Sequence, residues 1–103
     1  MTILITPQKA AANSSSITVA DNRSGTQERY DQYSTFRVIG ILGTDEYVKL
    51  QYYDGTTWRD AVINANEAKI LDEDNSVCSV YGRMSDMRVS KSITTTNVGV
   101  EII

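Results

Sequence analysis

The feature that most restricts the fold is an alternation of apolar and polar residues, repeated in short segments along most of the chain. In 47–53, for example, Val48, Leu50 and Tyr52 alternate with Lys49 and Gln51. Successive side chains of a β-strand point to opposite faces, so this pattern predicts strands with one buried face. No segment of helix length carries an apolar stripe with the 3.6-residue period of a helix that packs on a core.

Turn residues separate these segments at intervals of roughly ten residues, which predicts about seven to nine short strands. The Asp54-Gly55 pair predicts a tight hairpin, because glycine accepts the positive φ that such turns require. A parallel sheet would need a crossover of about a dozen residues between paired strands, and the segments leave no room for it. The fold class is therefore predicted to be all-β, as a small antiparallel β-sandwich of Ig-like architecture or a compact barrel.

The 103 residues fit a single domain. We expect residues 16–103 to form one β-sandwich domain and residues 1–15 to form an N-terminal arm or an edge strand. Both ends of the chain are apolar, with Ile3-Leu4-Ile5 at one end and residues 98–103 at the other. Such ends either complete the domain's own sheets or lie in an interface with another chain.

The residue types present exclude several kinds of chemistry. The chain has no histidine, which excludes a histidine-based triad and an imidazole base. Its one cysteine, Cys78, cannot form an intrachain disulfide or a zinc cluster and is predicted to be a small buried hydrophobe. We therefore expect no enzyme activity and no cofactor, although a pair of carboxylates such as glycosidases use is not excluded.

The acidic run Asp72-Glu73-Asp74-Asn75 is predicted to be a solvated turn. Carboxylate oxygens are the ligands that calcium prefers, but this run lacks the ligand spacing and the glycine of an EF-hand loop. The sequence alone leaves open whether it binds a cation.

Charge and hydrophobicity also restrict the partners. The net charge is −3 and the basic residues are scattered, so nucleic acid is not the expected partner. The longest apolar runs are far shorter than the ~20 residues of a membrane-spanning helix, so no membrane partner is expected. No secretory signal follows Met1, which favours synthesis and folding in a reducing cytoplasm.

The aromatic residues suggest surfaces for binding. Tyr30 and Tyr33 lie in a polar segment, and Tyr47 and Tyr53 lie opposite the apolar face of their strand. With Trp58 across the predicted hairpin, Tyr47 and Tyr53 are the candidate exposed aromatics. Such rings pack across strands, anchor protein interfaces or stack on sugars, and the sequence leaves these roles open.

Several short features follow one another along residues 16–103. They are Ile17-Thr18-Val19, the Val-x-Leu-Gln-Tyr segment 48–52, the Asp54-Gly55 hairpin with Trp58, Val80-Tyr81-Gly82, and Val98-Gly99-Val100. This pattern resembles small β-sandwich virion proteins of tailed bacteriophages, which serve as capsid decoration proteins or as head and tail accessory proteins.

The resemblance implies a capsid decoration (cement) protein that binds and stabilises neighbouring capsid subunits and carries no cofactor. Its partners would be the major capsid protein or other virion proteins, and it would itself be a dimer or trimer. It would be made in the host cytoplasm and end up in the virion. Two alternatives are a carbohydrate- or receptor-binding module of a head or tail fibre and a small inhibitor of a host defence protein.

The expected contact elements are 7–16 and 22–33, the longest stretches without apolar alternation of their own. Segments of this kind can become ordered on a partner. The predicted partner-binding residues are Pro7, Gln8, Lys9, Asn13, Asn22, Arg23, Gln27, Arg29, Tyr30 and Tyr33.

Overall fold

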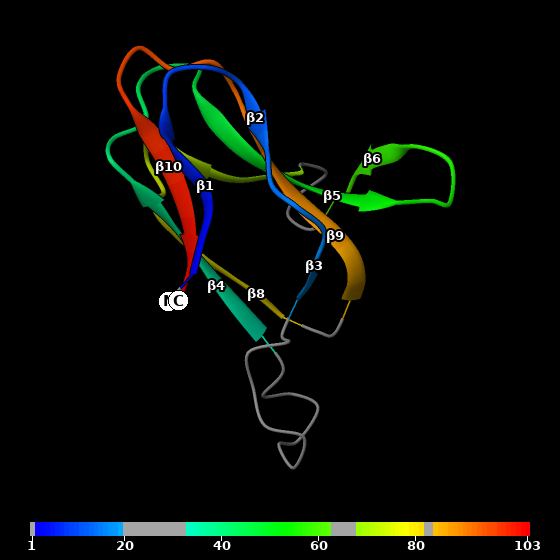
Figure 1. The fold of residues 1–103 in the computed structure, drawn as a ribbon. Coiled ribbons are helices and arrows are strands. Elements are labelled where there is room, and N and C mark those ends of the chain that lie inside the picture. Colours follow the sequence, from blue (N-terminus) through cyan, green and yellow to red (C-terminus); the bar gives the residue numbers. More distant parts are fainter. Residues whose placement is uncertain (1, 20–32, 63–67, 82–83) are drawn as a thin grey trace.

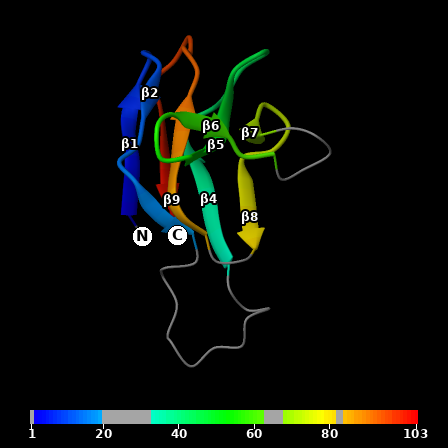
Figure 2. The ribbon, with the colours of Figure 1, turned by 90° about the vertical axis from the view of Figure 1, so that its right-hand side faces the viewer.

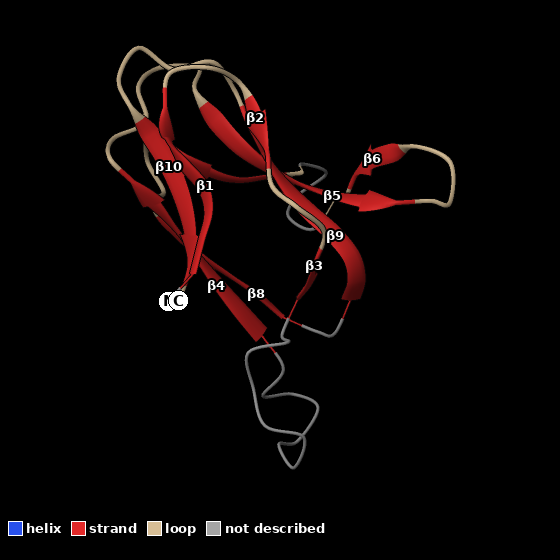
Figure 3. Ribbon diagram, viewed as in Figure 1, coloured by secondary structure: helices blue, strands red, loops and turns tan. Residues whose placement is uncertain are grey.

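The computed structural model describes residues 2–19, 33–62, 68–81 and 84–103, and every regular element among them is a strand (Figure 3). The strands are β1 (Thr2–Gln8), β2 (Ala12–Asn13), β3 (Ile17–Val19), β4 (Tyr33–Ile39), β5 (Tyr47–Tyr53), β6 (Trp58–Asp60), β7 (Lys69–Asp72), β8 (Val77–Tyr81), β9 (Met84–Lys91) and β10 (Val98–Ile102). They form two antiparallel sheets packed as a sandwich, which confirms the predicted all-β class (Figure 1). Of the two predicted architectures, the chain adopts the β-sandwich, with two separate sheets rather than one closed sheet.

One sheet has four strands in the order β1-β10-β4-β8. The other has six, in which β9 and β5 are central; β2 and β3 both pair with β9, and β6 and β7 both pair with β5. The first and last strands are neighbours, because Thr2 pairs with Ile102, so the two ends of the chain lie side by side (Figures 1 and 2). The apolar ends therefore complete the domain's own sheet, and β1 and β2 are edge strands of different sheets.

The core lies between the inner faces of the two sheets. Phe36 and Val100 from the four-stranded sheet and Val48, Leu50 and Val89 from the six-stranded sheet are fully buried. Burying one such side chain stabilises a fold by about 1.5–3 kcal/mol, so each of these residues contributes strongly to stability. In β5, Val48 and Leu50 are buried and alternate with half-buried residues, as the sequence predicts. Tyr52, predicted on the same buried face, is 39% exposed, because this end of β5 belongs to a hairpin that extends beyond the four-stranded sheet (Figure 1).

Candidate binding surfaces

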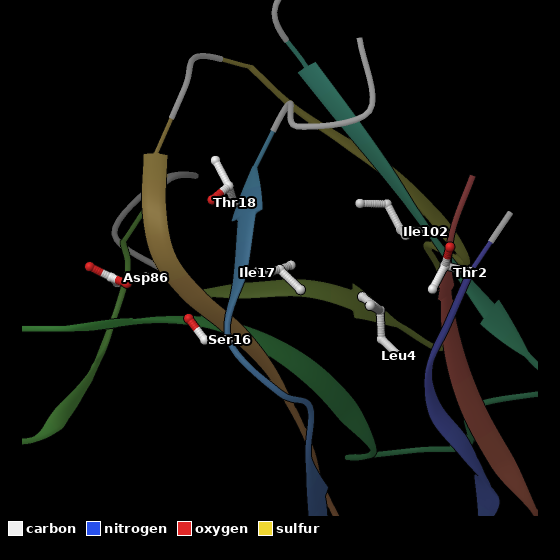
Figure 4. A pocket seen from close by; sticks show the side chains of 7 residues that line it. All are labelled: Thr2, Leu4, Ser16, Ile17, Thr18, Asp86 and Ile102. Carbon is white, nitrogen blue, oxygen red and sulfur yellow. The ribbon is translucent and has the colours of Figure 1, made fainter.

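An open cleft of about 410 Å³ separates the two sheets along one side of the sandwich (Figure 4). Leu4 and Ile102 line it from the four-stranded sheet and Ile17 from β3, and these three partly buried side chains pack against the core. The remaining lining residues are polar: Thr2, Ser16, Thr18 and Asp86. On this side the four-stranded sheet ends at β1 and the other sheet ends at β2 and β3. The cleft thus leaves part of the core's apolar surface open to a partner.

A β-bulge in β1 places Leu4 at this cleft. Ile3 pairs with Glu101 and Ile5 pairs with Val100, so β1 advances two residues where β10 advances one. Leu4 is the extra residue of the bulge. Ile5 then enters the core, while Leu4 lines the cleft.

Gly99 lets β1 approach β10 this closely. A Cβ atom on Gly99 would lie 2.5 Å from the carbonyl oxygen of Ile5 and 2.8 Å from the nitrogen of Pro7. Both are main-chain atoms of the paired strand, so they cannot move away without displacing β1. Only glycine fits at this position, because any other residue would add a Cβ atom where β1 leaves no room.

Two more apolar side chains are exposed near the ends of the chain, on the outer face of the four-stranded sheet. Ile3 is 58% exposed and Ile103 is 46% exposed. Ile3 pairs with Glu101, and Ile103 follows Ile102; since successive side chains of a strand point to opposite faces, both isoleucines point away from the cleft. The terminal apolar patch therefore consists of the three apolar residues that line the cleft: Leu4, Ile17 and Ile102. Grouped exposed apolar side chains are typical of interaction sites.

Part of the predicted contact surface lies along the same side of the sandwich. Pro7 and Gln8 end β1, Lys9 begins the connection to β2, and Asn13 lies in β2; all four side chains are exposed or half-buried. Their main chain is already ordered, since the Thr94 N–H donates to the Lys9 carbonyl at 2.9 Å and β2 pairs with β9. These residues therefore offer a preformed surface rather than a segment that awaits a partner.

The rest of that prediction falls outside what the structure describes. Tyr33 begins β4 opposite Tyr81, but its side chain is not among the described ones. The other five predicted residues lie outside the described residues: Asn22, Arg23, Gln27, Arg29 and Tyr30.

The β5–β6 hairpin projects away from the four-stranded sheet (Figures 1 and 2). The Asp54 carboxylate organises its turn: Oδ1 accepts hydrogen bonds from the N–H groups of Thr56 and Thr57, both at 2.8 Å, and Oδ2 pairs with Arg59. The Thr57 N–H, the Arg59 guanidinium and the Thr56 N–H hold the pKa of Asp54 far below its ordinary value. Gly55 follows with φ of +100°, which confirms the predicted hairpin.

Tyr53 and Trp58 pack together on the outer face of this hairpin. The ring centroids of Tyr53 and Trp58 are 5.3 Å apart with the planes tilted by 53°, and the guanidinium carbon of Arg88 lies 4.5 Å from the Trp58 centroid. Tyr47 and Tyr53 lie opposite the buried face of β5, as predicted, with Tyr53 exposed and Tyr47 half-buried. Because Arg88 covers one side of the Trp58 ring and the two rings are not coplanar, they do not form a flat platform for a sugar.

Sequence reasoning did not single out Glu46 and Lys91, which are two of the three charged residues buried in the described ranges. Glu46 is 8% exposed and accepts hydrogen bonds from the Gly43 N–H at 2.7 Å and the Thr95 N–H at 2.9 Å. Lys91 is 2% exposed, and its Nζ donates to the carbonyl of Ala10 at 2.8 Å. Burying a charged group costs free energy unless the group is hydrogen-bonded. The hydrogen bonds of Glu46 and Lys91 offset this cost and stabilise the connections between strands at one end of the sandwich. The available signal is that Lys91 continues the inward alternation of β9.

Acid should weaken the stabilisation that the Glu46 carboxylate provides. The N–H groups of Gly43 and Thr95 lower the pKa of Glu46 below its ordinary 4.5, with a smaller contribution from the Lys91 charge. A lowered folded-state pKa adds stability that is complete above the unfolded pKa and is lost as pH falls through the folded pKa. Below about pH 4.5, Glu46→Gln should therefore lose less stability on acidification than the wild type does, as measured by urea unfolding over a pH series.

Asp74→Asn is the matched control, since it removes an exposed carboxylate from the turn before β8. Its acid-induced loss of stability should equal that of the wild type. An identical loss in Glu46→Gln and the wild type would contradict the role given to Glu46.

The acidic run joins β7 to β8 as a tight turn, which confirms that prediction. Asp72 and Asn75 exchange main-chain hydrogen bonds at 3.0 and 3.2 Å, and the Asp74 N–H donates to Asp72 Oδ1 at 3.0 Å. Within the four described ranges, no three His, Cys, Asp or Glu residues are placed to hold a metal ion. Cys78 is half-buried against the core, and burial raises the pKa of its thiol.

The chain matches no protein-family model, and it has no significant match among curated proteins or among solved structures. In the part of the chain that the structure describes, no helix is long and apolar enough to span a membrane.

Proposed function

We propose that this chain is a structural protein of a bacteriophage virion, and specifically a capsid decoration protein that binds neighbouring capsid subunits. The observation that carries the proposal is the terminal apolar patch that lines the open cleft. The resemblance of residues 16–103 to phage virion proteins supplies the identity of the partner. A small sandwich with an uncovered apolar side is suited to docking on another protein.

The surroundings of the patch resemble the layout of protein interfaces, which have an apolar centre and a polar rim. The cleft would take apolar side chains of a capsid subunit, while Pro7, Gln8, Lys9 and Asn13 would contact the rim. Oligomeric copies on a repeating lattice bind with avidity, so each contact needs only a modest affinity.

Mass spectrometry of purified virions tests the proposal. We expect peptides of this chain in particles freed of unassembled protein, in a fixed ratio to the major capsid protein. Particles that lack the chain would rule the proposal out.

A substitution at the cleft should weaken capsid binding without unfolding the protein. Thr2→Asp places a charge at an exposed position that lines the cleft beside the terminal apolar patch. A docked capsid subunit would leave that charge buried without a partner, so binding should weaken by about tenfold or more in co-sedimentation with capsids.

Ile41→Asp is the matched control, because Ile41 is also strongly exposed but lies in the connection between β4 and β5. It should bind capsids like the wild type, and both variants should keep the wild-type melting curve. Equal capsid binding by Thr2→Asp and the wild type would exclude the cleft and its terminal apolar patch as the contact surface.

A carbohydrate-binding role has one observation in its favour, the exposed Tyr53 ring beside Trp58. The Arg88 guanidinium over Trp58 counts against it, because a sugar would have to displace that contact. A glycan array probed with the wild type and with Trp58→Ala separates the two roles: a signal lost in the variant would favour sugar binding.

A further inference from the structure

The four outer edges of the two sheets differ in how well they are protected. A strand at a sheet edge pairs with other strands unless a bulge, a proline, a charge or its shortness prevents this. β1 has a bulge at Leu4 and also contains Pro7. In the six-stranded sheet β2 has two residues and β3 and β6 have three each, and β7 carries Lys69 and Asp72. Each of these edges is protected by at least one such feature.

The remaining edge, β8, has none of these protections. Its five residues, Val77–Tyr81, include no charge and no proline. They pair with β4 at five consecutive positions without a register shift. Among the described strands, β8 is the last of its sheet, and Val77 and Ser79 are exposed.

The main-chain groups of β8 are arranged to accept another strand. The Val38 N–H donates to the Ser76 carbonyl at 3.0 Å, and this bond shows which residues of β8 form main-chain hydrogen bonds with β4. In an antiparallel pair every second residue bonds to the partner, so Cys78 and Val80 bond to β4. The main-chain groups of Val77, Ser79 and Tyr81 therefore point away from β4, toward the edge with which no described strand pairs.

We propose that β8 pairs antiparallel with β8 of a second copy, about a two-fold axis through Ser79. The strand is complementary to itself in this register: Ser79 meets Ser79, Val77 meets Tyr81, and Cys78 meets Val80. All three residues whose main-chain groups point outward meet each other, and no like charges face across the axis. The two four-stranded sheets become one sheet of eight strands.

Self-complementarity is the reason for choosing a second copy over a strand of another protein. When two copies pair about a two-fold axis, the same strand of each copy meets the other, so the strand must be compatible with itself. β8 meets this condition because it carries no charge and because its central residue, Ser79, directs its main-chain groups toward the second copy. The inference is independent of the proposed virion role, since its test uses the purified protein alone.

Charge substitutions at the axis test the pairing. Ser79→Lys and Ser79→Glu each place two like charges face to face, so each variant should be monomeric by light scattering at concentrations where the wild type is dimeric. An equimolar mixture of the two variants should restore a dimer of one copy of each. Thr6→Lys, which places a charge on the edge strand β1, should leave the wild-type dimer intact.

A crosslink locates the axis. Directly opposed residues that exchange main-chain hydrogen bonds have Cα atoms about 5.5 Å apart, within the range of a disulfide. Ser79→Cys in a Cys78→Ser background should therefore form a disulfide-linked dimer with copper–phenanthroline, whereas Thr6→Cys in the same background should not. A monomeric wild type at all concentrations, or a dimer that persists in Ser79→Lys, would overturn the inference.

Discussion

Replacing Gly99 with valine is expected to destabilise the protein by about 3 kcal/mol, the upper part of the range for overpacked sites. The first added carbon would lie 2.5 Å from the Ile5 carbonyl oxygen, and the paired strand would have to move as a unit. That movement would pull Ile5 out of the core and open the β1–β10 pairing. Urea unfolding followed by circular dichroism measures the loss.

Gly55→Ala provides the comparison. A Cβ on Gly55 would meet no atom within 4 Å, but φ there is +100°. Gly55→Ala should therefore lower the free energy of unfolding only through the strained backbone conformation, by about 1 kcal/mol. If Gly99→Val were as stable as Gly55→Ala, the close approach of β1 to β10 would be wrong.

Replacing Phe36 with alanine is expected to cost about 3–5 kcal/mol, which is much of the stability of a domain of this size. Phe36 is the largest fully buried side chain and lies in β4, between β10 and β8. Its removal leaves a cavity that residues of two neighbouring strands cannot fill without leaving their register. The measurement is again urea unfolding, with the change in transition midpoint converted at constant m-value.

Ile41→Ala is the control for this substitution, because Ile41 is exposed in the connection after β4. It should change the free energy of unfolding by no more than about 0.5 kcal/mol. A similarly small change in Phe36→Ala would contradict the packing of the two sheets described above.

The features that follow from local pattern were predictable. In β5 the buried Val48 and Leu50 are two positions apart and could be identified from the sequence. The turn at Asp54-Gly55 was predictable for the same reason, since its conformation depends on the residues within it. Tyr52 continues the spacing of Val48 and Leu50 but is exposed, because alternation does not show where the opposite sheet ends.

The pairing of strands was not predictable, because alternation specifies a face but not a neighbour. β1 pairs with β10 at the opposite end of the chain, and nothing in either segment identifies the other. The bulge at Leu4 breaks the alternation, and the need for glycine at position 99 becomes visible only when β1 lies over it.

In the candidate surfaces, too, features set by local pattern could be predicted and features set by strand pairing could not. The outward placement of Tyr47 and Tyr53 follows from alternation. The terminal apolar patch depends on non-local pairing and could not be assembled from the sequence. The alternation from Met87 also predicts an inward Ile93, but β9 ends at Lys91 and Ile93 is exposed. The main chain leaves the sheet there, since the Thr94 N–H bonds to the Lys9 carbonyl.

A reconstruction of the virion that resolves β-strands would distinguish a capsid decoration protein from a tail protein. We expect density for the sandwich on the outer surface of the capsid, spanning neighbouring subunits, with the side formed by β1 and β3 facing the capsid. Density for the chain only in the tail, or a capsid contacted through the opposite side of the sandwich, would contradict it.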